Sequence, residues 1–159
     1  MVNIATIRKS GWLPRPYASE AARMTKRLAL GTAQFGLVYG VANKDGKVDS
    51  REVAELLFEA SRLGVDTLDT AVAYGDSEMV LGRIGVSKWN IVTKLPPLPE
   101  GCQDVDGWVF SEMRGSLQRL GVDHVDALLL HRPNQLLTSE GARLYQSLQR
   151  LKAEGMTQK

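Results

Sequence analysis

The sequence predicts an α/β fold of parallel strands joined by helices, arranged as the first four βα units of a partial TIM (β/α)8 barrel. Strand-like and helix-like segments alternate four times from Leu28 onward. Two strand-like runs, "IVTKL" and "ALLLH", lack polar alternation, as expected for strands covered on both faces. Ionisable residues lie at the ends of three of the strands, where barrels place their chemistry. A dinucleotide-binding doubly wound sheet is disfavoured because "GTAQFG" has the wrong glycine spacing.

Eight regular elements are expected. The strands are expected at residues 28–35, 65–71, 90–95 and 125–131, and the helices at 50–64, 76–85, 105–121 and 139–155. The first helix has apolar residues at i, i+3, i+4 and i+7, which is typical of an amphipathic helix. Asp49 is placed to cap it and Gly64 to end it. Glycines between residues 36 and 46 indicate a loop before that helix.

Composition limits the classes of function. With 43% hydrophobic residues the chain can form a core, and no apolar run approaches the ~20 residues of a membrane span. Residues 1–27 hold six basic side chains and one acid, and the rest has an excess of acids. No basic stripe suited to nucleic acid follows from this pattern, and no membrane partner is expected. Cys102 is the only cysteine, which favours a reducing cytoplasm.

The basic residues 1–27 are expected to form a disordered extension outside the folded domain of residues 28–159. Two other interpretations stay open. Translation could start at Met24, or the segment could be a transit peptide, although Pro14 and Pro16 interrupt an amphipathic helix there.

Four side chains with complementary chemistry recur at strand ends. Asp69, Lys94 and His131 end the second, third and fourth strands, and Tyr74 follows the first of these closely. Each has a bland explanation taken alone: a turn cap, a solvated lysine, a strand terminator or a packed aromatic ring. Together, a carboxylate, a phenol, an ammonium and an imidazole at one end of a barrel indicate a reaction centre. No metal-ligand cluster is seen.

The motifs also resemble a known family. The segments "LALGTAQFG", "DTAVAYGDSEMVLGRIG", "IVTKL" and "SLQRLGVDHVDALLLHRP" follow one another as in the aldo-keto reductases, in the style of a bacterial subgroup. The likeness spans residues 28–133 and extends to about residue 155 through "YQSLQRLKAEG". It implies a (β/α)8 barrel that moves a hydride between NADP or NAD and the carbonyl of a small-molecule substrate.

The resemblance assigns roles to the four side chains. It implies that Tyr74 is the general acid of carbonyl reduction. An ammonium group stabilises a neighbouring phenolate, and this is the role implied for Lys94. Asp69 would keep Lys94 charged and oriented, and His131 would hydrogen-bond the carbonyl oxygen.

The resemblance also implies cofactor contacts. Gly31, Thr32 and Asp69 would lie beneath the nicotinamide, although the first two could simply make a strand-to-loop turn. Glu78 and Gly82 recur in the family and are interpreted as structural. A non-catalytic regulatory module that binds a nucleotide or a protein on the same fold is the alternative function.

Length sets a further expectation. A complete barrel needs about 250 residues, whereas residues 28–159 suffice for four βα units. The chain is therefore expected to be a truncated N-terminal half that lacks the fifth strand and most of the cofactor site, with impaired activity alone. Strands one and four would be open edges that permit self-association, for example of two halves closing one barrel.

Overall fold

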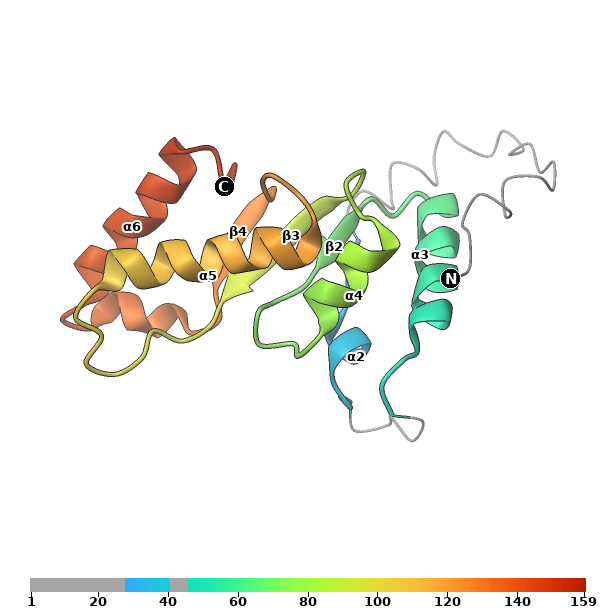
Figure 1. Ribbon diagram of the computed structural model, residues 1–159, viewed down its shortest axis with the longest axis horizontal. Helices are drawn as coiled ribbons and strands as arrows, with labels where there is room; N and C mark the ends of the chain where they lie inside the picture. Colours follow the sequence, from blue (N-terminus) through green and yellow to red (C-terminus); the bar gives the residue numbers. More distant parts are fainter. Residues whose placement is uncertain (1–27, 41–45) are drawn as a thin grey trace.

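The computed structural model describes residues 28–40 and 46–159. The predicted disordered extension at residues 1–27 lies outside the described residues. The predicted architecture is confirmed: strands and helices alternate along the chain, and the four strands form one parallel sheet in the order β1-β2-β3-β4. Neighbouring strands in sequence are neighbours in space, and β4, β3 and β2 follow one another across the middle of the view in Figure 1.

The strands are short and in register. They comprise β1 (Ala29–Gly31), β2 (Thr67–Asp69), β3 (Asn90–Leu95) and β4 (Ala127–Leu130). Gly31 pairs with Asp69, Asp69 with Val92, and Lys94 with Leu129. Because all pairs are parallel, the carboxyl ends of the strands lie along the same edge of the sheet.

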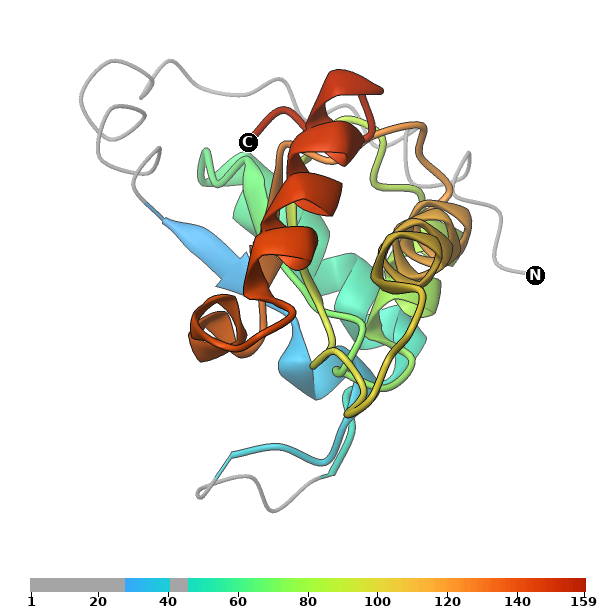
Figure 2. The same ribbon diagram turned by 90° about the vertical axis from the view of Figure 1, so that its left-hand side faces the viewer.

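Helices cover one face of this sheet. They are α3 (Ser50–Arg62), α4 (Ser77–Ile84), α5 (Val105–Leu120) and α6 (Gly141–Ala153). Figure 2 shows α5 in gold on one side of the molecule, with the edge strand β1 in blue on the other side of the view. Between sheet and helices lies a core that includes Phe35, Val53, Leu57, Leu68, Leu81, Ile91, Leu95, Val109, Met113, Leu120, Leu144 and Leu151.

The opposite face of the sheet is not covered by the described residues. Along β3, Ile91, Thr93 and Leu95 are buried, whereas Val92 and Lys94 are only partly buried. Leu129 of β4 is 45% exposed. The expectation of strands covered on both faces was therefore wrong for residues 28–40 and 46–159, whose helices pack on one side of the sheet.

Local sequence signals explain the helix ends. The Asp49 side chain accepts hydrogen bonds from the backbone N–H groups of Arg51 (2.8 Å) and Glu52 (3.1 Å), as predicted for an N-cap. These donors hold the pKa of the Asp49 carboxyl below its ordinary value. Gly121 ends α5 in the left-handed conformation with φ 68°, where a side chain would be strained.

The first unit departs from the prediction. The strand ends at Gly31, and Ala33–Gly36 form one turn of helix, α2, instead of continuing the strand. Phe35 is buried in the core, so tertiary packing outweighs the extended preference of the segment. A 3-10 helix, η2 (Pro133–Leu137), was also not predicted; it begins with a proline, whose fixed φ suits a helical start.

A fifth strand position is partly filled. Thr157 pairs in parallel with Val125, and the N–H of Leu128 donates to the carbonyl of Lys159 (3.0 Å). The C-terminus accordingly lies beside β4 in Figure 1. The prediction that this edge is fully open was therefore wrong up to Leu128, while β1 pairs only with β2 among the described strands.

Glu78 and Gly82 fit the structural role expected of them. Glu78 is 1% exposed, and its carboxylate accepts hydrogen bonds from Thr93 (2.6 Å) and Arg119 (2.8 Å). A Cβ at Gly82 would lie 2.0 Å from the Arg119 carbonyl oxygen. Both residues thus join α4 to its neighbours.

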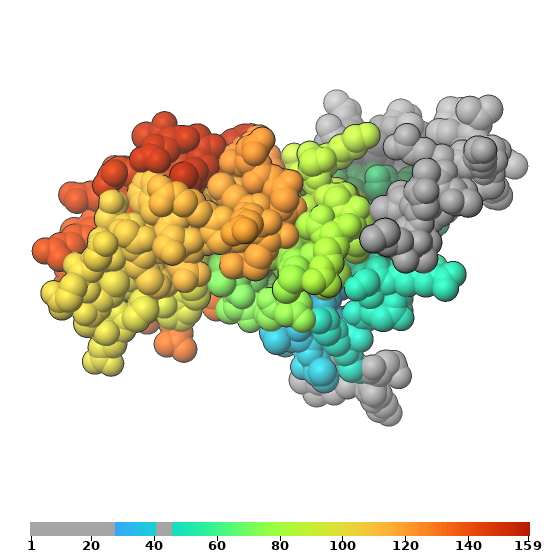
Figure 3. Space-filling model, viewed as in Figure 1, coloured from blue at the N-terminus to red at the C-terminus, as the bar shows by residue number. Residues whose placement is uncertain are grey.

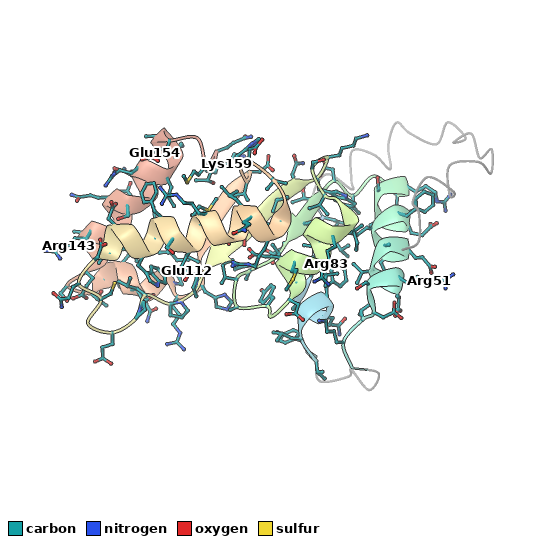
Figure 4. The ribbon with its side chains drawn as sticks, in the orientation of Figure 1. Arg51, Arg83, Glu112, Arg143, Glu154 and Lys159 are labelled. Carbon is teal, nitrogen blue, oxygen red and sulfur yellow. The ribbon has the colours of Figure 1, made fainter. Side chains whose placement is uncertain are left out.

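The surface carries ordinary features. The space-filling view follows the chain order across one face, from α6 to α3 (Figure 3). Arg51 on α3 and Arg143 on α6 point outward at opposite ends of the molecule (Figure 4). Within residues 28–40 and 46–159, no helix is long and apolar enough to cross a membrane, and no group of three potential metal ligands occurs.

Candidate active site

The four predicted site residues meet at the carboxyl edge of the sheet. Asp69 is the last residue of β2, and Lys94 is the penultimate residue of β3. His131 directly follows β4, and Tyr74 lies in the loop between β2 and α4. The structure brings all four together from three neighbouring βα units.

Lys94 is the centre of the site. Its Nζ lies 2.5 Å from Asp69 Oδ1, 3.0 Å from the Thr70 carbonyl oxygen and 3.4 Å from Tyr74 Oη. The Lys94 side chain is 15% exposed and the Asp69 side chain 36%. The ammonium therefore has a carboxylate, a carbonyl and a phenol as its three partners, which matches its three donors.

Tyr74 lies beside both Lys94 and His131. The Tyr74 and His131 rings are 5.9 Å apart and nearly perpendicular, at 83°. Lys94 Nζ lies 4.9 Å from the Tyr74 ring centroid. His131 is exposed, and its backbone N–H donates to the Leu95 carbonyl (3.0 Å). This bond fixes the point at which the chain leaves the sheet after β4. The Tyr74 side chain thus has both an ammonium and an imidazole as neighbours.

Close backbone packing holds the turn that carries Tyr74. The Tyr74 N–H donates to the Ala71 carbonyl (3.0 Å), and the Ser77 N–H donates to the Tyr74 carbonyl (3.1 Å). A Cβ at Gly36 would lie only 1.7 Å from the Tyr74 carbonyl oxygen. Sequence reasoning took Gly36 for a loop residue, because a contact between segments so far apart leaves no local signal.

Three buried hydroxyl groups lie behind Asp69. The side chains of Thr32, Thr70 and Ser77 belong to residues that are 0% exposed. Ser77 Oγ lies 2.9 Å from Thr32 Oγ1 and 3.1 Å from Thr70 Oγ1. Thr32 Oγ1 donates to the Asp69 carbonyl (3.0 Å). The sequence alone did not indicate that Thr70 and Ser77 belong to this cluster.

The residues predicted to contact a cofactor differ in their surroundings. Gly31 is exposed, and a Cβ there would meet nothing within 4 Å. Gly31 also pairs with Asp69, so open space lies beside the site. The Thr32 hydroxyl instead points into the buried cluster. Their contacts with a nicotinamide stay a prediction.

Two further contacts join the loops around the site. Lys47 Nζ lies 2.8 Å from Asp76, two residues after Tyr74, and this ammonium holds the pKa of the Asp76 carboxyl below its ordinary value. The Gln135 amide binds both the N–H and the carbonyl of Leu98, each at 2.9 Å. The second contact ties the loop after β3 to η2.

Comparison with known proteins agrees with this geometry. The model of the aldo/keto reductase family matches residues 27–159. An aldo-keto reductase of Mycolicibacterium vanbaalenii is 31% identical over 119 residues, covering 70% of this chain and 40% of that protein. A Schizosaccharomyces pombe protein assigned as a voltage-gated potassium channel subunit beta is 28% identical over 131 residues, covering 74% of this chain and 38% of that protein.

A solved structure shows the same fold. It is that of a Pseudomonas aeruginosa protein assigned to the aldo-keto reductases, with 34% identity and a TM-score of 0.66. The match covers 81% of this chain and 52% of that one. The chain thus spans about half the length of this relative and less of the curated ones. Sequence, fold and site geometry agree that the chain belongs to the aldo/keto reductase family.

Proposed function

We propose that this chain supplies the proton-donating half of an NAD(P)H-dependent carbonyl reductase, with Asp69, Tyr74, Lys94 and His131 as catalytic residues. The observation that supports this most is the position of Lys94 Nζ, 2.5 Å from Asp69 and 3.4 Å from Tyr74 Oη. When bound, the nicotinamide supplies a hydride to the carbonyl carbon, so negative charge develops on the carbonyl oxygen. That oxygen must then be protonated.

Tyr74 donates this proton. Its Oη is the phenol nearest the ammonium, and the cation stabilises the phenolate that remains. Asp69 keeps Lys94 directed at the phenol through the contact between the carboxylate and the ammonium. The Asp69–Lys94 pair is thus preorganised before substrate binds.

His131 orients the carbonyl. Its ring stands nearly perpendicular to that of Tyr74 at a centroid distance of 5.9 Å, so the imidazole is the second polar side chain beside the phenol. Such a second donor stabilises developing charge on the oxygen. Gly31, Thr32 and Asp69 would form the nicotinamide end of the cofactor site, for NADP or NAD.

We propose this activity for a complete barrel. Because the chain spans 52% of the Pseudomonas aeruginosa relative, we expect the chain alone to be impaired in cofactor binding and turnover. The β1 edge is the proposed route for self-association. The proposed substrate is a small-molecule carbonyl compound. The proposed compartment is the cytoplasm, because the Cys102 thiol is free.

The second candidate is a non-catalytic module that binds a nucleotide or a protein. It is favoured by the 28% identity to a protein assigned as a potassium channel subunit. Titration of the chain with NADH and NADPH, followed by fluorescence, measures nucleotide binding independently of turnover.

A chimera tests the catalytic proposal. Residues 28–159 would replace the matching part of the Pseudomonas aeruginosa relative, which provides the remaining barrel, and NADPH oxidation would be followed with an aldehyde. We expect turnover, and a loss of at least about 100-fold in kcat with Tyr74→Phe. Tyr145→Phe, a change at an exposed tyrosine on α6, is the matched control. Equal kcat for Tyr74→Phe and Tyr145→Phe would refute the role of Tyr74 and favour the binding module.

A further inference from the structure

The three buried hydroxyls behind the site form an ordered chain of hydrogen bonds. Each hydroxyl has a single proton to donate. Thr32 Oγ1 donates to the Asp69 carbonyl (3.0 Å). Ser77 Oγ donates toward Thr32, whose carbonyl oxygen and Oγ1 each lie 2.9 Å from it. Thr70 Oγ1 therefore donates to Ser77 Oγ, 3.1 Å away. The hydrogen bonds therefore run from Thr70 to Ser77, from Ser77 to Thr32 and from Thr32 to Asp69.

This chain ends on the residues that hold Lys94. Two of the three partners of Lys94 are Asp69 Oδ1 and the Thr70 carbonyl. Both belong to the segment that the buried hydroxyls contact. The third partner, Tyr74 Oη, lies on the turn whose carbonyl accepts from the Ser77 N–H (3.1 Å). A shift of the segment 69–77 would therefore move all three partners together.

We infer that Thr32, Thr70 and Ser77 are positioning residues whose hydroxyl chain fixes the three partners of Lys94 and thereby sets the geometry of the proton donor. The role of the set in catalysis rests on the proposed function, whereas its effect on Lys94 does not. Buried hydroxyls of this kind are costly if left unpaired, and no unpaired buried side-chain polar atom occurs among residues 28–40 and 46–159. The cluster thus exists as a complete set, contributed by the residues directly after β1 and β2 and by the first residue of α4.

Two substitutions at Thr32 separate the effect of its hydroxyl group from the effect of its volume. Thr32→Val keeps the shape of the side chain and removes its donor, whereas Thr32→Ser removes a methyl group and keeps the donor. If the hydroxyl positions Asp69, only Thr32→Val should disturb Lys94. If Thr32 merely fills space, Thr32→Ser should disturb it at least as much.

The test observes the Lys94 ammonium in the full chain by NMR after 15N-lysine labelling, with Lys94→Arg for assignment. Held by three acceptors and 15% exposed, its protons should exchange with water more slowly than those of exposed Lys152. In Thr32→Val and Ser77→Ala we expect the exchange rate of the Lys94 ammonium to rise about fivefold, the factor for loss of one buried hydrogen bond. Thr32→Ser should stay within twofold of the unchanged chain.

Ser147→Ala is the matched control. Ser147 is 2% exposed, and its hydroxyl donates to the Arg143 carbonyl (3.0 Å) within α6, far from the site in the chain. It should leave the Lys94 signal unchanged. The inference is overturned if Thr32→Val and Ser77→Ala leave Lys94 exchange within twofold, or if Thr32→Ser acts as strongly as Thr32→Val. Because no cofactor is needed, an inactive chimera with the expected exchange pattern would contradict the proposed function alone.

Discussion

Gly36 offers the sharpest structural prediction. A Cβ at this position would lie 1.7 Å from the Tyr74 carbonyl oxygen, 2.5 Å from the Ser77 nitrogen and 2.8 Å from the Asp76 nitrogen. All three atoms belong to backbone, which cannot rotate away as a flexible side chain could. Since real Cβ contacts essentially never fall below 3.0 Å, the Tyr74 carbonyl must retreat by about 1.3 Å, the difference between 3.0 and 1.7 Å.

The expected cost of Gly36→Ala is about 3 kcal/mol in the free energy of unfolding, the upper end for overpacking a well-packed site. The matched control is Gly31→Ala, because a Cβ there meets nothing within 4 Å; it should change stability by less than about 1 kcal/mol. Urea unfolding followed by circular dichroism measures both values. In the chimera, a displacement of about 1 Å at Tyr74 should also lower kcat by about 100-fold. Equal stability and equal kcat for Gly36→Ala and the unchanged chimera would refute the close packing.

Two further predictions concern charges. Glu78→Ala should destabilise the chain by about 3 kcal/mol in urea unfolding, the low end for breaking a buried ion pair, since the Arg119 side chain is 35% exposed. Glu59→Ala, at a more exposed pair, should cost less than about 1 kcal/mol; equal losses would contradict the burial argument. The Lys47 ammonium lowers the pKa of Asp76 in the folded chain, so this carboxylate stabilises the fold above pH 3.8 and less as the pH falls further. The stability difference between the unchanged chain and Asp76→Asn should therefore shrink below pH 3.8, and a constant difference would contradict the assignment.

The order of elements could be predicted from the sequence because it depends on local signals. The pattern of β3, for example, was predicted with the bounds that the structure has, Asn90–Leu95, since Pro96 and Pro97 follow it at once. The convergence of Asp69, Lys94 and His131 followed from their places at the ends of parallel strands. Parallel neighbours bring such ends together whatever the loops do.

The remaining features depend on contacts between distant segments. The turn of helix at Ala33–Gly36 forms because Phe35 is buried and Gly36 approaches the Tyr74 carbonyl. The hydroxyl chain joins residues 37 and 45 positions apart, and threonine or serine gives the same local signal whether exposed or buried. The pairing of Thr157 with Val125 likewise depends on how α6 returns the chain to the sheet.

A nuclear Overhauser measurement on the full chain, with labelled tyrosine and histidine rings, tests directly whether the side chains of Tyr74 and His131 meet. We expect a cross-peak between the Tyr74 and His131 rings, whose centroids lie 5.9 Å apart, and its loss in His131→Ala. A well-resolved spectrum without this cross-peak would contradict the convergence of the two rings on one reaction centre.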